Sequence, residues 1–466
     1  MPVNRDNRER GATAVIVAVV IAMLFGIGVL AVDVAHLYLS RNELQGAADA
    51  CALRGAGMLY FDFATNKYAA EPQTTANREA RDAGIANKAE KTAVEVNWTS
   101  GNTGDVQRGH WSFGRGTLPK GFSPSGSLAA FDLWNKTEPE LDDAAGQDMS
   151  HPAFINAVRC ETRRESTPVT NFLAPILGLF GGPGLVRSIV RAEAVAVVGF
   201  AGSLEPYGVD QPFGICAHMI VDANGDYTCN LGRMLNNNTQ TAMWTSFDQS
   251  TCSASSNEVR TLVQLCASSG NSESLVLGQE LGSTNGVDNS VLVAFQNCWK
   301  TGLHRDTNGD GVGDAILDTD ADGLPNLPWE ITLPVINCLA GTCTPIVGAV
   351  TVKVLWMVDT AHLSGGNMYD EAPTKMDGWT CSSLTTGGAR PTPDCATIAS
   401  AGDKRQCCWN EFVAHFNLKG AANNTTPAPY AQKTTYFVPD CTAHEPIGST
   451  GGKNFGILAK YPVLVR

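Results

Sequence analysis

The sequence lacks the short motifs that identify the common enzyme classes. It has no HExxH zinc helix, no GxSxG nucleophile elbow, no GxxxxGK(S/T) phosphate loop and no GxGxxG turn after a strand. Its eight histidines are scattered, and none has a neighbour at metal-ligand spacing. These absences predict a protein that is not an enzyme, and an anchored periplasmic enzyme is the least favoured interpretation.

Positive charge is also scarce. Lysine and arginine together number 33 against 46 acidic residues, so the formal net charge is −13. Nucleic-acid-binding proteins concentrate lysine and arginine, whereas the densest basic cluster here, Arg159, Arg163 and Arg164, is interleaved with Glu161 and Glu165. The sequence therefore predicts no nucleic-acid partner.

Cysteine is abundant, but no CxxC pair occurs among the 14 cysteines. Without metal-site spacing, so many cysteines indicate disulfides formed outside the reducing cytosol. Adjacent Cys407 and Cys408 must find separate partners. Spacing does not fix connectivity, but near neighbours would close four short loops: Cys216/Cys229, Cys252/Cys266, Cys338/Cys343 and Cys381/Cys395.

Residues 11–32 form a run of 22 residues without a charged side chain. About 20 apolar residues cross a bilayer as a helix. Because Arg5, Arg8 and Arg10 precede the run, we expect a cytoplasmic N-terminus and export of everything after Val32. A cleaved signal peptide is the alternative, although its apolar region is usually only ~7–15 residues long.

The helical pattern continues beyond the apolar run. Residues 33–60 contain no proline, and small and apolar residues recur at three- and four-residue steps. The sequence predicts one helix from Ala12 to about Tyr60, with two helices broken near Ser40 as the alternative. The recurring residues are Leu37, Leu44, Ala48, Cys51 and Gly55. Of these, we expect Leu37, Leu44, Ala48 and Gly55 to pack on a partner helix.

The predicted fold class is α+β, in three parts. Residues 1–60 carry the N-terminus, the transmembrane anchor and the protruding helix. Residues 61–202 form a small α+β domain, and residues 203–466 form a β-rich distal domain stabilised by disulfides. For the middle part the pattern predicts helices at 75–93 and 168–178 and strands at 94–99, 108–113, 157–162 and 190–198. For the distal part it predicts strands at 274–277, 291–295, 331–336, 350–358, 434–438 and 461–465.

Two Asp-rich segments in register lie within 306–326. Each reads D-x-(D/N)-x-D-G, in which alternating oxygens converge on a hard cation and the glycine permits a sharp turn. The pattern favours structural calcium over a solvated acidic loop. The candidate ligands are Asp306, Asn308, Asp310, Asp314, Asp318, Asp320, Asp322 and Asn326.

The stretch Leu44–Ala56, LQGAADACALRGA, lies in the helical segment that continues from the apolar run. It resembles the stretch after the anchor helix of TadE/TadG-like proteins, which assemble Flp (tight-adherence) pili. A Cys-containing, TadG-like subgroup shares Cys51, the later Val158-Arg159-Cys160 and the segment 172–178.

The resemblance implies a Cys51–Cys160 disulfide and a pilin-like arrangement of an anchor helix backed by a sheet. It also implies a bacterial inner-membrane protein, with a single span and its bulk periplasmic or surface-exposed. The expected partners are other TadE/TadG-like or pilin-like subunits of the pilus machinery. The alternative function is a calcium-stabilised adhesin or binding module that meets a surface ligand.

Overall fold

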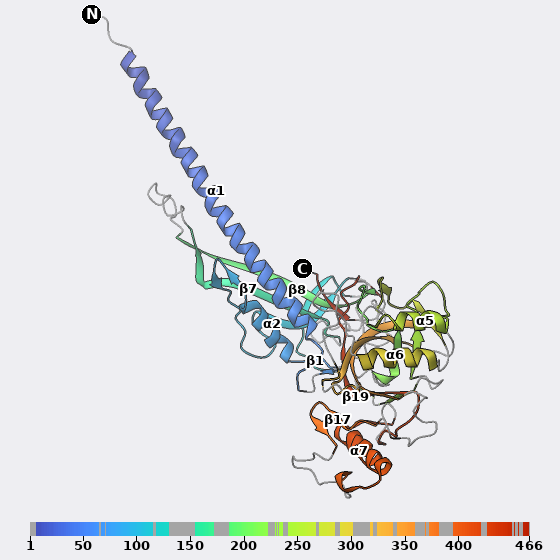
Figure 1. The fold of residues 1–466 in the computed structure, drawn as a ribbon. Coiled ribbons are helices and arrows are strands. Elements are labelled where there is room, and N and C mark those ends of the chain that lie inside the picture. The colour runs from blue at the N-terminus through green and yellow to red at the C-terminus, as the bar shows by residue number, and fades with distance from the viewer. Residues whose placement is uncertain are drawn as a thin grey trace, which may run out of the picture.

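The structure is a computed structural model. It describes residues 6–64, 67–69, 71–114, 118–129, 154–171, 186–221, 229, 231, 233–235, 241–266, 270–284, 289–301, 317–319, 324–338, 343–358, 369, 372–381, 395–420, 426–449, 452, 455 and 460–465. One long helix projects from a body of mixed helices and strands (Figure 1). The predicted α+β class with a long N-terminal helix is confirmed.

Helix α1 (Asp6–Gly57) is a single continuous helix of 52 residues. At about 1.5 Å per residue it is roughly 78 Å long. Ser40 lies inside it, and its hydroxyl donates to the carbonyl of His36, 3.1 Å away and one turn earlier. The prediction of one helix, rather than two broken near Ser40, is therefore confirmed.

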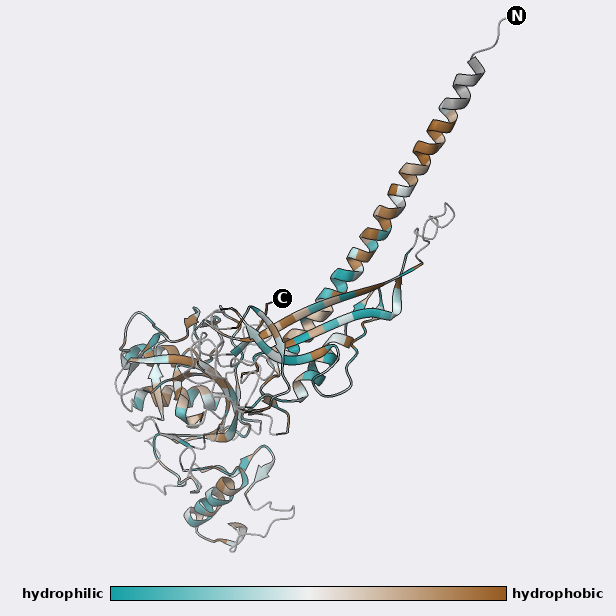
Figure 2. Ribbon diagram, turned by 180° about the vertical axis from the view of Figure 1, so that it is seen from behind, coloured by the Kyte–Doolittle hydropathy of each residue, from teal (hydrophilic) through white to brown (hydrophobic). Residues whose placement is uncertain are grey.

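From Thr13 to Val32, α1 is apolar and uncovered, as the brown segment of Figure 2 shows. An 18-residue window in this helix has a mean hydropathy of 3.1, and none of that window is buried within the chain. By length and composition, this is a helix that can cross a membrane.

The second half of α1 packs on a five-stranded antiparallel sheet. Alternate side chains of a strand point to opposite faces of a sheet. Helices α1 and α2 (Thr75–Ile85) lie together on one face (Figure 1). In spatial order the strands are β20 (Lys460–Leu464), β8 (Arg187–Phe200), β7 (Ala157–Thr170), β5 (Val106–Ser112) and β6 (Gly121–Pro124).

Most of the predicted elements of this region are present. The strands expected at 108–113, 157–162 and 190–198 are β5, β7 and β8 with shifted or longer bounds. The strand expected at 94–99 is reduced to one bridge between Glu95 and Arg163. Of the helix expected at 168–178, the first three residues belong to β7 and the remainder is outside the described residues, apart from Asn171.

Strand β20 comes from the region that the sequence division assigned to the distal domain. It pairs with β8 from Lys460↔Phe200 to Leu464↔Ala196. The last described strand thus completes the sheet that holds the anchor helix.

A second sheet of seven strands lies between β8 and β20 along the chain. Strand β15 pairs in parallel with β10 and antiparallel with β16, so β16, β14, β12, β10 and β15 close into a barrel. In spatial order the strands are β11 (Arg233–Leu235), β19 (Thr434–Ala443), β16 (Cys343–Val358), β14 (Glu280–Thr284), β12 (Ala242–Thr245), β10 (Phe213–Cys216) and β15 (Trp329–Ile336).

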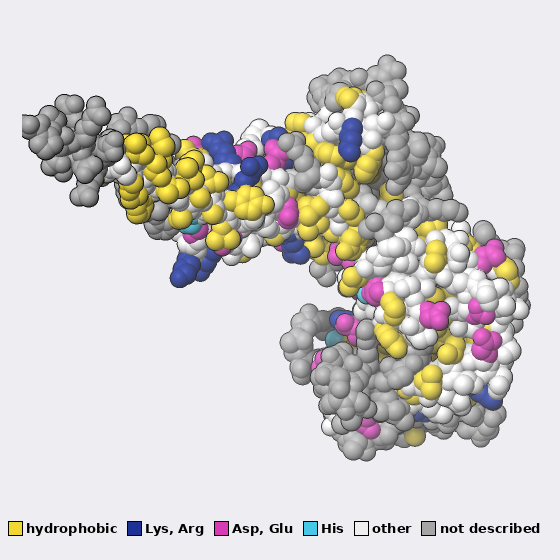
Figure 3. All heavy atoms as spheres, turned by 90° about the horizontal axis from the view of Figure 1, so that it is seen from above, with side chains coloured by type: hydrophobic (Ala, Val, Ile, Leu, Met, Phe, Trp, Pro, Cys, Tyr) yellow, Lys and Arg dark blue, Asp and Glu magenta, His cyan; other side chains and the backbone are white. Residues whose placement is uncertain are grey.

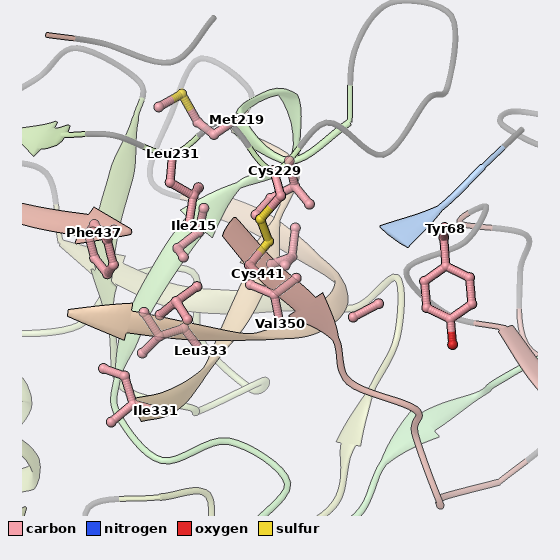
Figure 4. Packing of buried hydrophobic residues seen from close by; sticks show 14 of the residues in the cluster. Tyr68, Ile215, Met219, Cys229, Leu231, Ile331, Leu333, Val350, Phe437 and Cys441 are labelled. Carbon is pink, nitrogen blue, oxygen red and sulfur yellow. A yellow bond between two sulfur atoms is a disulfide. The ribbon is translucent and has the colours of Figure 1, made fainter. Parts of the chain in front are cut away.

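The barrel packs a dense hydrophobic core. Figure 4 shows Ile215, Leu333, Val350 and Phe437 converging from four different strands. Aromatic rings extend this core, with centroids 4.8 to 5.7 Å apart among Phe213, Trp244, Phe295 and Trp329.

The strand predicted at 291–295 is wrong, because these residues lie in helix α6 (Asn289–Thr301). A short apolar run does not distinguish a buried strand from a buried helix. The helical spacing becomes visible only when the run is extended by one turn. The buried residues then recur at three- and four-residue steps: Val291, Leu292, Phe295, Cys298 and Trp299.

Shorter elements complete the described structure. The helices are α5 (Ser256–Val263), α7 (Ala401–His415), and the 3₁₀ turns η2 (Ala217–Met219) and η5 (Cys395–Thr397). The short strands are β1 (Phe61–Asp62), β2 (Lys67–Tyr68), β3 (Lys88–Ala89), β4 (Thr92–Ala93), β9 (Ser203–Leu204), β13 (Leu275–Val276), β17 (Lys375–Met376) and β18 (Trp379–Thr380).

Seven disulfides account for every cysteine of the chain, and the four short-loop pairs predicted from spacing are all wrong. Strands bring together cysteines that are distant in sequence: Cys216, at the end of β10, bonds Cys338, just beyond its parallel neighbour β15. As expected, Cys407 and Cys408 have separate partners. The bonds are Cys51–Cys160, Cys216–Cys338, Cys229–Cys441, Cys252–Cys343, Cys266–Cys298, Cys381–Cys408 and Cys395–Cys407.

The close packing of α1 predicts the effect of substituting its glycines. A Cβ at Gly55 would lie 2.7 Å from Val158 Cγ1 and 2.8 Å from Ala80 Cβ. We expect Gly55→Ala to lower the free energy of unfolding by about 1–3 kcal/mol, because overpacking displaces neighbours.

Gly46→Ala on the same helix is the matched control, since a Cβ there meets no atom within 4 Å. It should be neutral, or stabilise by up to roughly 1 kcal/mol through helix propensity. Both variants can be compared by thermal unfolding in detergent. Equal effects of the two substitutions would contradict the packing described.

Candidate functional site

The second half of α1 is held on one face by its own chain. Leu44, Ala48 and Cys51 are fully buried, and the side chain of Thr162 on β7 donates to the carbonyl of Leu44 at 2.8 Å. The contact is close because the residues on this face are small. At Gly84 of α2, for example, an added Cβ would lie 3.3 Å from Cys51 Cβ.

This packing corrects the prediction for the small-residue stripe. Leu37 is half-buried, while Leu44, Ala48 and Gly55 are buried against β7, β8 and α2. The stripe therefore packs within the chain and is not available to a partner helix. The spacing identified a contact face correctly, but sequence alone does not tell whether its partner is intramolecular.

The Cys51–Cys160 disulfide joins this face of α1 to β7. Both cysteines are fully buried, and their Cα atoms lie 6.0 Å apart. It is the pair that the family resemblance implied. The bond closes a loop across 109 residues, for which chain entropy predicts a stabilisation of roughly 4–5 kcal/mol.

A polar contact fixes α1 where it meets the turn between β3 and β4. The imidazole of His36 and the hydroxyl of Ser40 both contact the Glu90 carboxylate. The backbone N–H of Glu90 in turn donates to the Glu43 carboxylate at 2.7 Å. Arg164 of β7 reaches the same turn and donates to the carbonyl of Ala89 at 2.7 Å.

A buried lysine lies at the other end of α1. Lys460 of β20 is 4% exposed, and its ammonium donates to the carbonyl of Gly57 at 3.0 Å. That carbonyl belongs to the helix terminus that carries partial negative charge. The ammonium also lies 3.4 Å from the centroid of the Tyr68 ring, whose hydroxyl donates to Glu445 at 3.0 Å. Burial lowers the pKa of Lys460 to about 7, against the opposing effect of Glu445.

The opposite face of α1 is open to its surroundings. Figure 3 shows hydrophobic side chains gathered along the exposed part of the helix. Beyond the apolar run, Val34, Tyr38 and Leu39 are each more than half exposed, and Gly46 follows on the exposed side. This face, which we call the open face of α1, consists of Val34, Ala35, Tyr38, Leu39, Asn42 and Gly46.

The Asp-rich segment is only partly described. Asp306, Asn308, Asp310, Asp314, Asp320 and Asp322 lie outside the described residues, whereas Asp318 and Asn326 lie inside. Asn326 is buried, and its side-chain oxygen accepts from both the backbone N–H and the hydroxyl of Thr319. In this geometry the side-chain oxygen of Asn326 is hydrogen-bonded within its own segment. Calcium binding by the other residues stays a prediction.

A cavity of about 310 Å³ lies beside this segment. Its lining combines the buried indole of Trp379 with polar groups of Thr319, Asn326 and Asp377. The backbone N–H of Asp377 donates to the Asn326 carbonyl at 2.7 Å, which ties the β17–β18 hairpin to the Asp-rich segment.

Two family models match the N-terminal part of the chain. Residues 11–58 match the Flp pilus-assembly TadE/G-like model, and residues 55–196 match the Tad-like Flp pilus-assembly model. No curated protein and no solved structure gave a significant match. The matched residues cover α1, α2 and the strands β5, β6 and β7 with most of β8.

The burial of Lys460 predicts a pH dependence of stability. Its pKa is lower in the folded chain, at about 7, than its ordinary value of 10.5. The unfolded chain therefore binds more protons between these values, and stability should rise as pH increases from about 7 towards 10, by at most about 1.4 kcal/mol per pH unit.

Lys460→Met should remove this rise, because no proton can then be taken up at that position on unfolding. Lys353→Met, which removes an exposed lysine, is the matched control and should retain the rise. Denaturant unfolding across this pH range measures both. An unchanged pH profile in the Lys460 variant would refute the assignment.

Proposed function

We propose that this chain is a membrane-anchored, pilin-like component of the Flp pilus-assembly machinery, because residues 11–58 match the TadE/G-like model and residues 55–196 match the Tad-like model of that family. The observation that carries the proposal is the construction of α1. Its first half is apolar and uncovered, and its second half is locked into a folded domain by packing and a disulfide.

This construction suits a protein that must be held while other subunits assemble. Force applied to the helix passes to β7 through the Cys51–Cys160 bond and to β20 through Lys460. With Arg5, Arg8 and Arg10 on the cytoplasmic side, the sheet and the barrel lie in the oxidising compartment that seven disulfides require.

The open face of α1 is the surface proposed to contact other TadE/TadG-like or pilin-like subunits. It is uncovered beyond the apolar run, and Ala35 and Gly46 would let another helix approach closely. The helical partner therefore packs opposite the face that the chain's own sheet occupies.

A second candidate function is a binding module at the distal end. The cavity beside the Asp-rich segment favours it, because hydrogen-bonding groups of Thr319, Asn326 and Asp377 line one site. In this proposal calcium holds the segment 306–326 and thereby shapes the cavity wall at Thr319 and Asn326.

Calcium binding can be tested on the full chain. We expect calcium at 100 times its dissociation constant to raise stability by about 2.7 kcal/mol, measured as a shift in the melting temperature against a chelator. Replacing both Asp318 and Asp320 with Asn should abolish this shift. Asp377→Asn, which removes a carboxylate of the neighbouring cavity, should leave it intact. Absence of a shift in the original chain would refute the calcium proposal.

Pilus assembly can be tested by deleting the gene in its host, counting pili by electron microscopy and scoring surface attachment. We expect pili to be missing and the intact chain to restore them. Leu39→Glu places a charge on the open face and should fail to restore them, because burying an unpaired carboxylate in a helix interface is unfavourable.

Val276→Glu, at a similarly exposed apolar position on β13, is the control and should restore pili. Both variants must reach the membrane in equal amounts. Normal pili with poor attachment after deletion would favour the binding-module function. Normal pili with normal attachment would exclude both proposals.

A further inference from the structure

The hairpin of β7 and β8 is longer than the rest of its sheet. Strand β20 pairs only with residues 196–200 of β8, and β5 only with residues 157–160 of β7. The remaining strand pair runs beside α1 towards the N-terminal half of that helix (Figure 1). It stays ordered to its described end, where the N–H of Asn171 donates to the carbonyl of Val186 at 2.9 Å.

The end of this hairpin lies level with the end of the apolar run. The side chain of Gln45 donates to the carbonyl of Glu193 at 3.1 Å, which fixes the two elements side by side at that point. Six residues of strand from Glu193 to Arg187 span about 20 Å. That length corresponds to roughly 10–13 residues of helix, depending on the tilt between the elements. The hairpin end is therefore level with residues 32–35 of α1.

The side chains at this end are those of an interface with lipid. Val186 and Ile189 are 55% and 56% exposed. Arg187 is the charged residue that lies between Val186 and Ile189, whereas Arg191, further from the end, is ion-paired with Glu161 and Glu165. Exposed apolar side chains beside an arginine are a composition that enters the headgroup region of a bilayer.

A β-bulge in β7 sets the direction in which the hairpin runs. Between Arg164 and Val169 the register of β7 against β8 shifts, as at a β-bulge, which bends a strand. The Glu95 carboxylate holds the bulge by accepting from the backbone N–H groups of Ser166 and Thr167 at 2.8 and 2.9 Å.

We infer that the described end of the β7–β8 hairpin, at Val186 and Ile189, contacts the surface of the bilayer that α1 crosses. The inference rests on the proposed membrane anchoring. A helix alone leaves the domain free to rotate about its axis and to tilt. A second contact beside the helix axis fixes which way the open face of α1 points within the membrane plane.

The test uses the full chain in lipid nanodiscs, with a photo-crosslinking residue placed at one position at a time. Probes at Phe25, Ile189 and Ile447 all replace exposed apolar residues. We expect lipid adducts at Phe25 and Ile189 and none at Ile447, which lies near Glu205, away from the hairpin end. A probe at Val186 provides a second position if the Ile189 variant does not form the Cys51–Cys160 disulfide.

The outcomes separate the two proposals. Adducts at Phe25 but at neither hairpin position would overturn the bilayer contact and leave the anchor in place. No adduct at Phe25 would refute the anchoring itself. Adducts of the hairpin probe with a protein subunit in place of lipid would also overturn the inference and identify the hairpin end as a protein interface.

Discussion

The contact between the second half of α1 and the five-stranded sheet is the interaction on which the other features depend. An isolated helix of this length would leave its small-residue face in water, where alanine and glycine provide little hydrophobic stabilisation. Against β7, β8 and α2 the same small side chains permit close approach, so many weak dispersion contacts add up. The Cys51–Cys160 bond then removes the alternative in which the helix detaches.

The chain path reinforces this arrangement. The barrel lies between β8 and β20 in sequence, and β20 returns to pair with β8 and to place Lys460 at the end of α1. A division of the chain by amino-acid composition places every residue after 202 in one distal region. Pairing of strands divides the chain differently, because a strand near the end of the sequence belongs with the first sheet. The barrel is thereby held to the anchor at both of its chain connections.

Sequence was most informative where one physical requirement dominates. Residues 11–32 must be apolar to cross a bilayer, and the period of the following residues must match a helix to bury one face, so α1 was predictable to within a few residues. Sequence was least informative where several arrangements satisfy the same pattern. The apolar run 291–295 fits a strand and a helix equally well, and only its extension to Trp299 favours the helix. Cysteine spacing failed because the disulfides follow contacts of the folded chain: strand pairing brings Cys216 to Cys338, and helix packing brings Cys266 to Cys298.

The disulfide pattern also imposes an order on folding. If the chain is exported from its N-terminus, as proposed, Cys51 and Cys160 leave the cytoplasm before any other cysteine, so this pair can form without competition. The cysteines of the barrel can pair wrongly, because the partner of Cys229 is Cys441, 212 residues later in the chain, and nearer cysteines are available. Their correct pairing therefore depends on thiolate exchange, which rearranges mispaired bonds until β16 and β19 are in register and the buried pairs are reached. The Cys51–Cys160 bond can form early, whereas the sheet to which it belongs is complete only when β20, which follows the barrel in the chain, has paired with β8.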